Sequence, residues 1–156
     1  MTKISVLAVA IFAAIAAPPA RADAFYLGPW RVASAVVAPW ADTSRPLSTA
    51  EKDSLVGKTV TFRAAGIDGP KQLACRNLKY KLVDSGPDML FQGELAEPRE
   101  GKPPSDPAAA AAALGFKGTS WKTLETGCGN ELDFHFLDEK TAEFGLNDYV
   151  YRMEKQ

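Results

Sequence analysis

The sequence predicts a mainly β protein, a single antiparallel β-barrel of about eight strands with two short helices. Three observations lead to this fold class. Apolar residues alternate with polar ones along most of the chain after residue 22, which is the pattern of half-buried strands. Clusters of Gly, Pro, Asn and Asp separate the alternating segments and favour tight turns. Enough strands follow one another to close a small barrel without exposed edges.

Residues 1–22 have the pattern of a secretory signal peptide. Lys3 supplies a basic start, and an apolar run from Ile4 to Ala17 follows, interrupted only by Ser5. Ala20-Arg21-Ala22 then places small residues at the two positions that a signal peptidase recognises. The apolar run is shorter than the roughly 20 residues needed to cross a bilayer. An uncleaved membrane anchor is the alternative, but we expect no stable membrane insertion after cleavage.

The predicted export has consequences for the length of the mature chain and for the state of its cysteines. Cleavage after Ala22, or alternatively after Ala24, leaves residues 23–156, whose length suits one β-barrel domain in the periplasm or outside the cell. Its two cysteines, Cys75 and Cys128, are predicted to form a disulfide, because an exported protein folds in an oxidising compartment. Neither cysteine belongs to a C-x-x-C redox motif, so a structural role is favoured over a reactive thiol.

Alternating segments predict the individual strands. Val60 and Phe62 alternate with polar neighbours over 59–63, and Phe134 lies in an alternating segment at 132–136. Further strands are expected at 30–38, 78–82, 89–95, 124–128 and 142–153. The side-chain parity changes within the last of these, so either a turn or a β-bulge is expected at Asn147-Asp148.

Two helices are predicted by their caps. Ser48 and Glu51 have the spacing of a capping box at the start of a helix over 50–56. Asp106 is placed to cap a second helix, with proline at its first position and an alanine run through Ala113. We therefore interpret the alanine run as a short surface helix rather than a low-complexity segment.

The charge balance excludes one class of partner. The chain has 18 basic and 19 acidic residues and no basic stripe, which argues against nucleic acid as a ligand. Lys79 and Lys81, with Arg76 nearby, form only a modest basic cluster. A cluster of this size usually lies on a solvent-exposed strand face or protects an edge strand, and it binds an anion less often.

Asp133 and His135 are the first candidate binding residues. They lie two positions apart, so their side chains leave the same face of one strand. A carboxylate beside the chain's only histidine would orient a general base or begin a metal site. No further ligand or nucleophile motif accompanies them, so no catalytic or metal-binding residue is assigned. The favoured interpretation is a polar outer strand face.

Aromatic residues are the second candidate set. Trp40, Tyr149 and Tyr151 are spread through the chain and would line a binding cavity, although most aromatics in a small β domain belong to the core. Trp40 follows a proline at the start of a polar loop. It either plugs one barrel end or contacts a partner, and plugging is the favoured alternative.

Gly28-Pro29-Trp30 opens the first predicted strand, and Arg152 lies near the end of the last one. The resemblance of these two ends to lipocalin-like barrels, which include small bacterial periplasmic inhibitors, rests on the tripeptide, which matches the G-x-W start of that superfamily, and on the arginine. It implies that Trp30 plugs the closed end of the barrel and that Arg152 packs over its ring. The two predicted helices depart from the family pattern. The inhibitory loop motif of the c-type lysozyme inhibitors is absent from the sequence.

Such a resemblance implies binding without catalysis and without a cofactor. The leading hypothesis is therefore an exported binding or inhibitor module of the periplasm or cell envelope. Its partner would be a small apolar ligand or a periplasmic or extracellular protein. A hydrolase or metal-dependent enzyme centred on Asp133 and His135, and a structural envelope protein, remain alternatives. A barrel with a filled interior would shift the expected site to the loops at 40–46 and 97–104.

Overall fold

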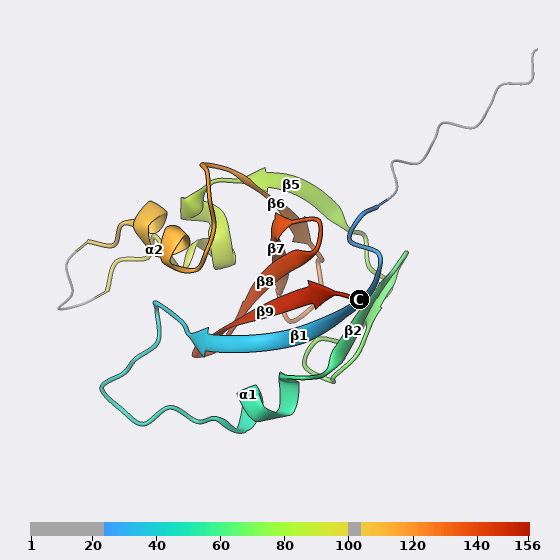
Figure 1. The fold of residues 1–156 in the computed structure, drawn as a ribbon, viewed down its shortest axis with the longest axis horizontal. Coiled ribbons are helices and arrows are strands. Elements are labelled where there is room, and N and C mark those ends of the chain that lie inside the picture. The colour runs from blue at the N-terminus through green and yellow to red at the C-terminus, as the bar shows by residue number, and fades with distance from the viewer. Residues whose placement is uncertain (1–23, 100–103) are drawn as a thin grey trace, which may run out of the picture.

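The computed structural model describes residues 24–99 and 104–156, and the predicted signal peptide lies outside them. The described residues form one nine-stranded antiparallel sheet that is curled into a half-barrel (Figure 1). This confirms the mainly β fold class. Within the described residues, no helix is long and apolar enough to cross a membrane.

The sheet places the first and last strands side by side at its centre. The strand order is β4-β3-β2-β1-β9-β8-β7-β6-β5. The strands are β1 (Gly28–Val37), β2 (Thr59–Arg63), β3 (Gly66–Asp68), β4 (Cys75–Arg76), β5 (Lys81–Ser85), β6 (Trp121–Glu125), β7 (Asp133–Asp138), β8 (Thr141–Leu146) and β9 (Tyr149–Lys155). Helix α1 (Ala50–Leu55) follows β1, whereas the 3-10 segment η1 (Pro87–Gly93) and α2 (Pro107–Ala113) separate β5 from β6.

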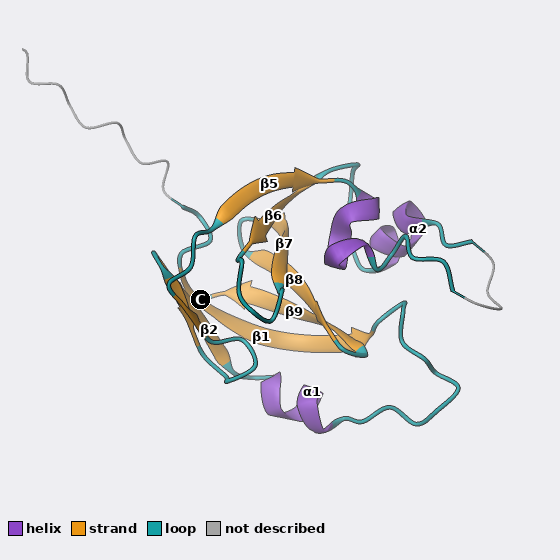
Figure 2. Cartoon of the chain, turned by 180° about the vertical axis from the view of Figure 1, so that it is seen from behind, coloured by secondary structure: helices purple, strands orange, loops and turns teal. Residues whose placement is uncertain are grey.

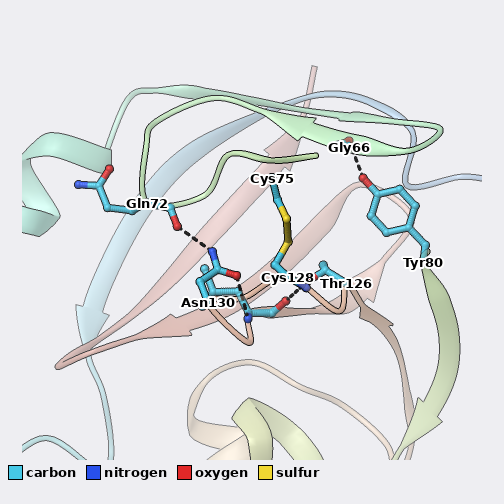
Figure 3. The surroundings of a disulfide bond; sticks show 8 residues. Gly66, Gln72, Cys75, Tyr80, Thr126, Cys128 and Asn130 are labelled. Atoms are coloured by element: carbon cyan, nitrogen blue, oxygen red, sulfur yellow. Dashed lines mark hydrogen bonds between the residues drawn. A yellow bond between two sulfur atoms is a disulfide. The ribbon is translucent and has the colours of Figure 1, made fainter. Parts of the chain in front are cut away.

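Side chains, rather than strand pairing, connect the two edges of the sheet. The edge strands β4 and β5 do not pair with each other. The predicted disulfide is confirmed: Cys75 in β4 is bonded to Cys128, which lies in the loop after β6 (Figure 3). The Tyr80 hydroxyl, just before β5, also donates to the Gly66 carbonyl at 2.6 Å. The barrel is therefore a half-barrel closed by a covalent bond.

Aromatic side chains fill the concave face. Trp30, Phe62, Phe134, Phe144 and Tyr151 are all fully buried there. The Phe62 and Phe134 rings meet edge to face with centroids 4.8 Å apart, and the Phe144 and Tyr151 rings stack at 5.0 Å. Contacts of this kind add to the hydrophobic stabilisation of the core. The interior of the half-barrel is thus occupied by the chain's own side chains.

A second core lies on the convex face. η1 and α2 lie together outside the curled sheet (Figure 2). Their apolar residues, including Phe91 and Ala111, pack with Trp121 of β6 and Val150 of β9. We call η1 and α2 together the cover. It turns part of the outer sheet surface into a buried layer.

The predicted strand at 89–95 is wrong, because this segment forms η1. Phe91 and Gln92 have left-handed backbones, with φ of 53° and 57°, so the chain turns sharply there instead of extending. The 142–153 segment resolves into two strands, β8 and β9, and Asn147 makes the turn with φ of 50°. The strand expected at 78–82 starts only at Lys81.

The two helix caps have different outcomes. Asp106 caps α2 as predicted, because its Oδ1 accepts from the backbone N–H groups of Ala108 and Ala109. The capping box predicted for α1 is wrong. Thr49 occupies the N-cap position without a side-chain bond, and the Glu51 carboxylate accepts hydrogen bonds from residues of the β8–β9 hairpin instead.

Candidate functional site

A polar cleft of about 490 Å³ opens at one end of the half-barrel. The loop after β1, the start of α1 and the turn between β8 and β9 form its walls. Its lining residues are Arg45, Ser48, Glu51, Asn147, Asp148 and Tyr149. We call it the loop-end cleft. It gathers segments about 100 residues apart in the chain, because β9 pairs with β1 at the centre of the sheet.

Glu51 organises the inner side of the loop-end cleft. Its Oε2 accepts from Asn147 Nδ2 at 2.6 Å, and its Oε1 accepts from the Tyr151 hydroxyl at 3.1 Å. Burial, followed by the nearby Glu51 charge, raises the pKa of Tyr151, so the phenol stays a donor. These bonds fix the carboxylate and the turn before any ligand arrives.

Arg45 supplies the exposed positive charge of the loop-end cleft. Its guanidinium lies 3.5 Å from the Asp148 carboxylate and 3.7 Å from that of Asp42. Arg45 and Asp42 are largely in solvent, whereas the Asp148 side chain is only 24% exposed. Ion pairs with such an exposed arginine contribute little to stability, so a ligand would displace them at low energetic cost.

Trp40 does not line this cleft but is bonded to Asn147, which does, and it connects the cleft to the cover. Its Nε1–H donates to the Asn147 carbonyl at 2.8 Å, and its ring lies 5.2 Å from that of Phe91. A Cβ at Gly145 would come within 2.8 Å of the indole, so glycine is needed for this close packing. Trp40 is half-buried against the convex side and does not enter the barrel interior.

The two tyrosines predicted to bind are core residues. Tyr151 is fully buried and Tyr149 nearly so. Tyr149 lines the inner wall of the loop-end cleft, whereas Tyr151 reaches it only through its hydroxyl bond to Glu51. Their shared parity in β9 points both rings at the concave core.

His135 is sealed beneath the cover, contrary to the predicted solvent-facing strand. Its Nε2 accepts from the Phe91 backbone N–H at 2.9 Å. The proton of the neutral ring is therefore on Nδ1, which donates to Thr123 Oγ1 at 2.9 Å. Complete burial lowers the pKa of His135 to about 3. Neither ring nitrogen remains for a substrate or a metal.

Asp133 is half-buried beside the same turn. Burial raises the pKa of its carboxyl, and this is opposed by hydrogen bonds from the Gln92 side chain and the Thr126 backbone. Asp133 and His135 thus hold the two left-handed residues of η1, Phe91 and Gln92. Among the described residues, no group of three His, Cys, Asp or Glu side chains is arranged to hold a metal ion.

The cation–π contact implied for Trp30 and Arg152 is wrong. Residues of odd number in β9 face the concave core, so Arg152 points to the convex side. Lys155 takes the expected place, with Nζ 5.8 Å from the centre of the Trp30 ring. Trp30 itself is fully buried in the concave core, with its Nε1–H bonded to the Tyr26 carbonyl at 2.8 Å.

Arg152 instead pairs with the buried carboxylate of Glu143. Its Nε and Nη2 donate to Glu143 Oε1 at 2.9 and 2.7 Å, and Nη2 also donates to the Leu114 carbonyl at 2.7 Å. In the strand register, a polar row crosses the convex face from β1 to β6: Ser34, Arg152, Glu143, His135 and Thr123. The cover is bonded to this row at two points, Phe91 and Leu114.

The sequence does not predict the roles of Glu51, Asn147 and Glu143. The spacing of Glu51 from Ser48 indicates a helix cap, but the partners of its carboxylate lie about 100 residues away. Glu143 had the ordinary signature of an outward-facing polar residue between Ala142 and Phe144. No local pattern indicated that a separate segment would cover it.

Comparisons of the chain with family models, curated proteins and solved structures found no significant match.

Proposed function

We propose that this chain is an exported, non-catalytic binding module on a lipocalin-like half-barrel, and that it recognises a protein partner through the loop-end cleft. The filled concave core is the observation that carries the proposal. Lipocalin-like barrels that carry small apolar ligands need an open interior. Here that space holds Trp30, Phe62 and Phe134, so binding is assigned to the outer surface at the loop end.

The properties of the loop-end cleft suit a polar macromolecular surface. It presents both signs of charge, with Arg45 beside Asp148. Trp40 adds a rigid aromatic group next to the lining residue Asn147, since its indole is both bonded and packed. The Glu51 bonds hold the wall in one arrangement, and preorganisation of this kind lowers the free energy lost on binding.

The structure of the Asp133–His135 pair disfavours the hydrolase hypothesis. A general base must reach the proton it removes. His135 is occupied on both ring nitrogens and shielded by Phe91. The disulfide supports an oxidising compartment, since such bonds persist mainly in exported proteins.

Partner capture from the exported fraction, followed by titration with the purified partner, tests this proposal. The full chain should retain one protein, and the double substitution Arg45→Ala with Asp148→Ala should raise its dissociation constant roughly tenfold or more. Arg63→Ala is the matched control, because Arg63 forms an exposed pair with Asp68 on another part of the sheet. Its affinity should equal that of the unsubstituted chain.

Two results would contradict the proposal. One is stoichiometric binding of a fluorescent fatty acid that quenches the fluorescence of Trp30, since such binding requires space within the concave core. The other is an equal loss of partner affinity in the control and the double variant. That result would mean that the loop-end cleft is not part of the binding interface.

A further inference from the structure

A second, smaller cleft lies on the convex face, beside the end of α2. Its volume is about 260 Å³. The floor comes from β1, β9 and β8, and the wall from the C-terminal end of α2. Its lining residues include Ser34, Val36, Val150, Glu143, Arg152 and Leu114. We call it the arginine cleft. It is separate from the loop-end cleft, and the inference below does not depend on the proposed function.

The arginine cleft contains an unfilled acceptor. Glu143 Oε2 has no hydrogen-bond partner among the described residues, although its side chain is only 4% exposed. Buried carboxylate oxygens are normally bonded, because an unpaired charged oxygen away from water is strongly unfavourable. The other oxygen, Oε1, already accepts two bonds from Arg152.

An unfilled donor lies on the partner of that carboxylate. Arg152 donates its hydrogen bonds from Nε and Nη2, and none of the described residues accepts from Nη1. The side chain is 39% exposed and lines the cleft. Gly115, whose φ is 98°, leaves room for this guanidinium, since a Cβ there would lie 2.9 Å from Nη2.

An apolar surface adjoins these two groups. Val36 is 51% exposed on β1, and the buried Val150 lies opposite it in the β1–β9 register. The alanines at the end of α2 provide a smooth wall with no charge. The cleft therefore combines a donor, a buried acceptor and an apolar surface within one small volume.

We propose that the arginine cleft binds a small zwitterion of the α-amino-acid type with an apolar side chain. Its ammonium would donate to Glu143 Oε2, its carboxylate would accept from Arg152 Nη1, and its side chain would lie on Val36. The charges of Glu143 and Arg152 cancel, so a simple anion or a simple cation gains little net attraction. A molecule that carries both charges satisfies both groups.

Binding should depend on the charge of Glu143. The groups facing it are Arg152 on β9 and the neutral His135, its register neighbour on β7, while α2 presents no charged side chain. Burial, opposed by Arg152, raises the pKa of Glu143 to about 6. An ammonium ligand requires the ionised carboxylate, so its affinity should fall as the pH drops through this value. Because Oε2 is closed to solvent, Arg152 must shift as the ligand enters.

L-Valine is the probe for this site, with calorimetric titration and ligand-observed NMR as readouts. We expect saturable binding to the full chain near neutral pH, weaker by roughly tenfold or more when Glu143→Gln removes the charge. N-acetyl-L-valine, which lacks the ammonium, and L-valinamide, which lacks the carboxylate, should each bind comparably weakly. Glu125→Gln is the matched control, since Glu125 forms a surface pair with Lys81, and it should leave the affinity unchanged.

Ser34→Ala and Val36→Asp keep the test valid if Glu143→Gln disturbs the fold. Both residues are exposed on β1, so their substitution should spare stability, yet Val36→Asp should block the apolar surface and abolish binding. Absence of saturable L-valine binding overturns the proposal. So does an affinity that is unchanged in Val36→Asp, or that is equal for L-valine and both derivatives.

Discussion

Phe134 and His135 are neighbours in β7, both fully buried, yet they belong to different kinds of core. Phe134 faces the concave side, where it meets the rings of Phe62 and Phe144. His135 faces the convex side, where it has one hydrogen-bond partner on each ring nitrogen. The concave core is stabilised by the close packing of apolar side chains, whereas the convex core depends on polar groups that are each matched to a hydrogen-bond partner.

This difference follows from how each face is covered. The strands themselves enclose the concave side, and their alternation already supplies apolar side chains there. The convex side is enclosed by the cover, which lies between β5 and β6 in the chain. Polar residues that would otherwise face solvent are buried by it, and each must then be satisfied by a specific donor or acceptor. The two cores should therefore respond differently to pH and to truncation.

Acidification should cause the largest loss of stability, and this loss should originate in the convex core. The pKa of His135 is lowered from 6.5 to about 3, so the folded state excludes a proton that the unfolded chain binds. Stability is complete above about pH 6.5 and is lost as the pH falls towards 3, by on the order of 5 kcal/mol. Urea unfolding across this range measures the loss, and His135→Gln should remove that part of the slope. An unchanged slope in the variant would assign the acid sensitivity to other groups.

Truncation should have the next largest effect, on the concave side. Phe134→Ala removes a fully buried ring from the aromatic core and should destabilise the protein by about 4 kcal/mol. Unlike the histidine effect, this loss should not vary with pH. Phe25→Ala, at a half-buried ring on the edge of the same core, is the control and should lose much less. Chemical denaturation at two pH values separates the cases.

Removal of the disulfide should lower the stability by a similar amount but through a different mechanism. Cys75 and Cys128 are 53 residues apart, and constraint of such a loop in the unfolded state is worth about 4 kcal/mol in the chain-entropy model. The double substitution to serine should open the half-barrel between β4 and the loop after β6. Hydrogen exchange should increase first in β3 and β4, with the cover unaffected. Uniform exchange across both cores would mean that the two faces unfold together.

Glu143→Gln should change the stability least. The contribution of Glu143 to stability should also depend on pH in the opposite sense to that of His135. The pKa of Glu143 is raised from 4.5 to about 6, so its contribution is complete below about pH 4.5 and is lost as the pH rises through 6. The unsubstituted protein should therefore lose about 2 kcal/mol over this interval relative to the glutamine variant. Thermal unfolding at mildly acidic and neutral pH measures the difference. Parallel curves for the two proteins would contradict the assignment.

Particular residues show where sequence reasoning succeeded. The alternation at 59–63 and 132–136 predicted strands whose apolar residues are in the concave core, because a strand alternates its faces whatever its partners are. Asp106 predicted the start of α2 because a cap acts on the next turn of backbone. Both signals are local.

Other residues show where it failed. Met89 to Leu95 has the composition of a strand but forms η1, because Phe91 and Gln92 turn in the left-handed region while held by His135, Asp133 and Trp40. The family resemblance implies that Arg152 packs on Trp30, but its strand parity directs it to Glu143. Each outcome depends on residues more than 40 positions apart or on the strand register.

The mainly β fold class, the concave core and the pairing of the two cysteines follow from the sequence alone. Alternation and residue chemistry are properties of short segments and do not depend on how the rest of the chain is arranged. The burial of particular outward-facing polar residues and the positions of the clefts depend instead on tertiary packing. Whether His135 and Glu143 meet water or a cover depends on where α2 and η1 pack, and packing is a property of the whole chain.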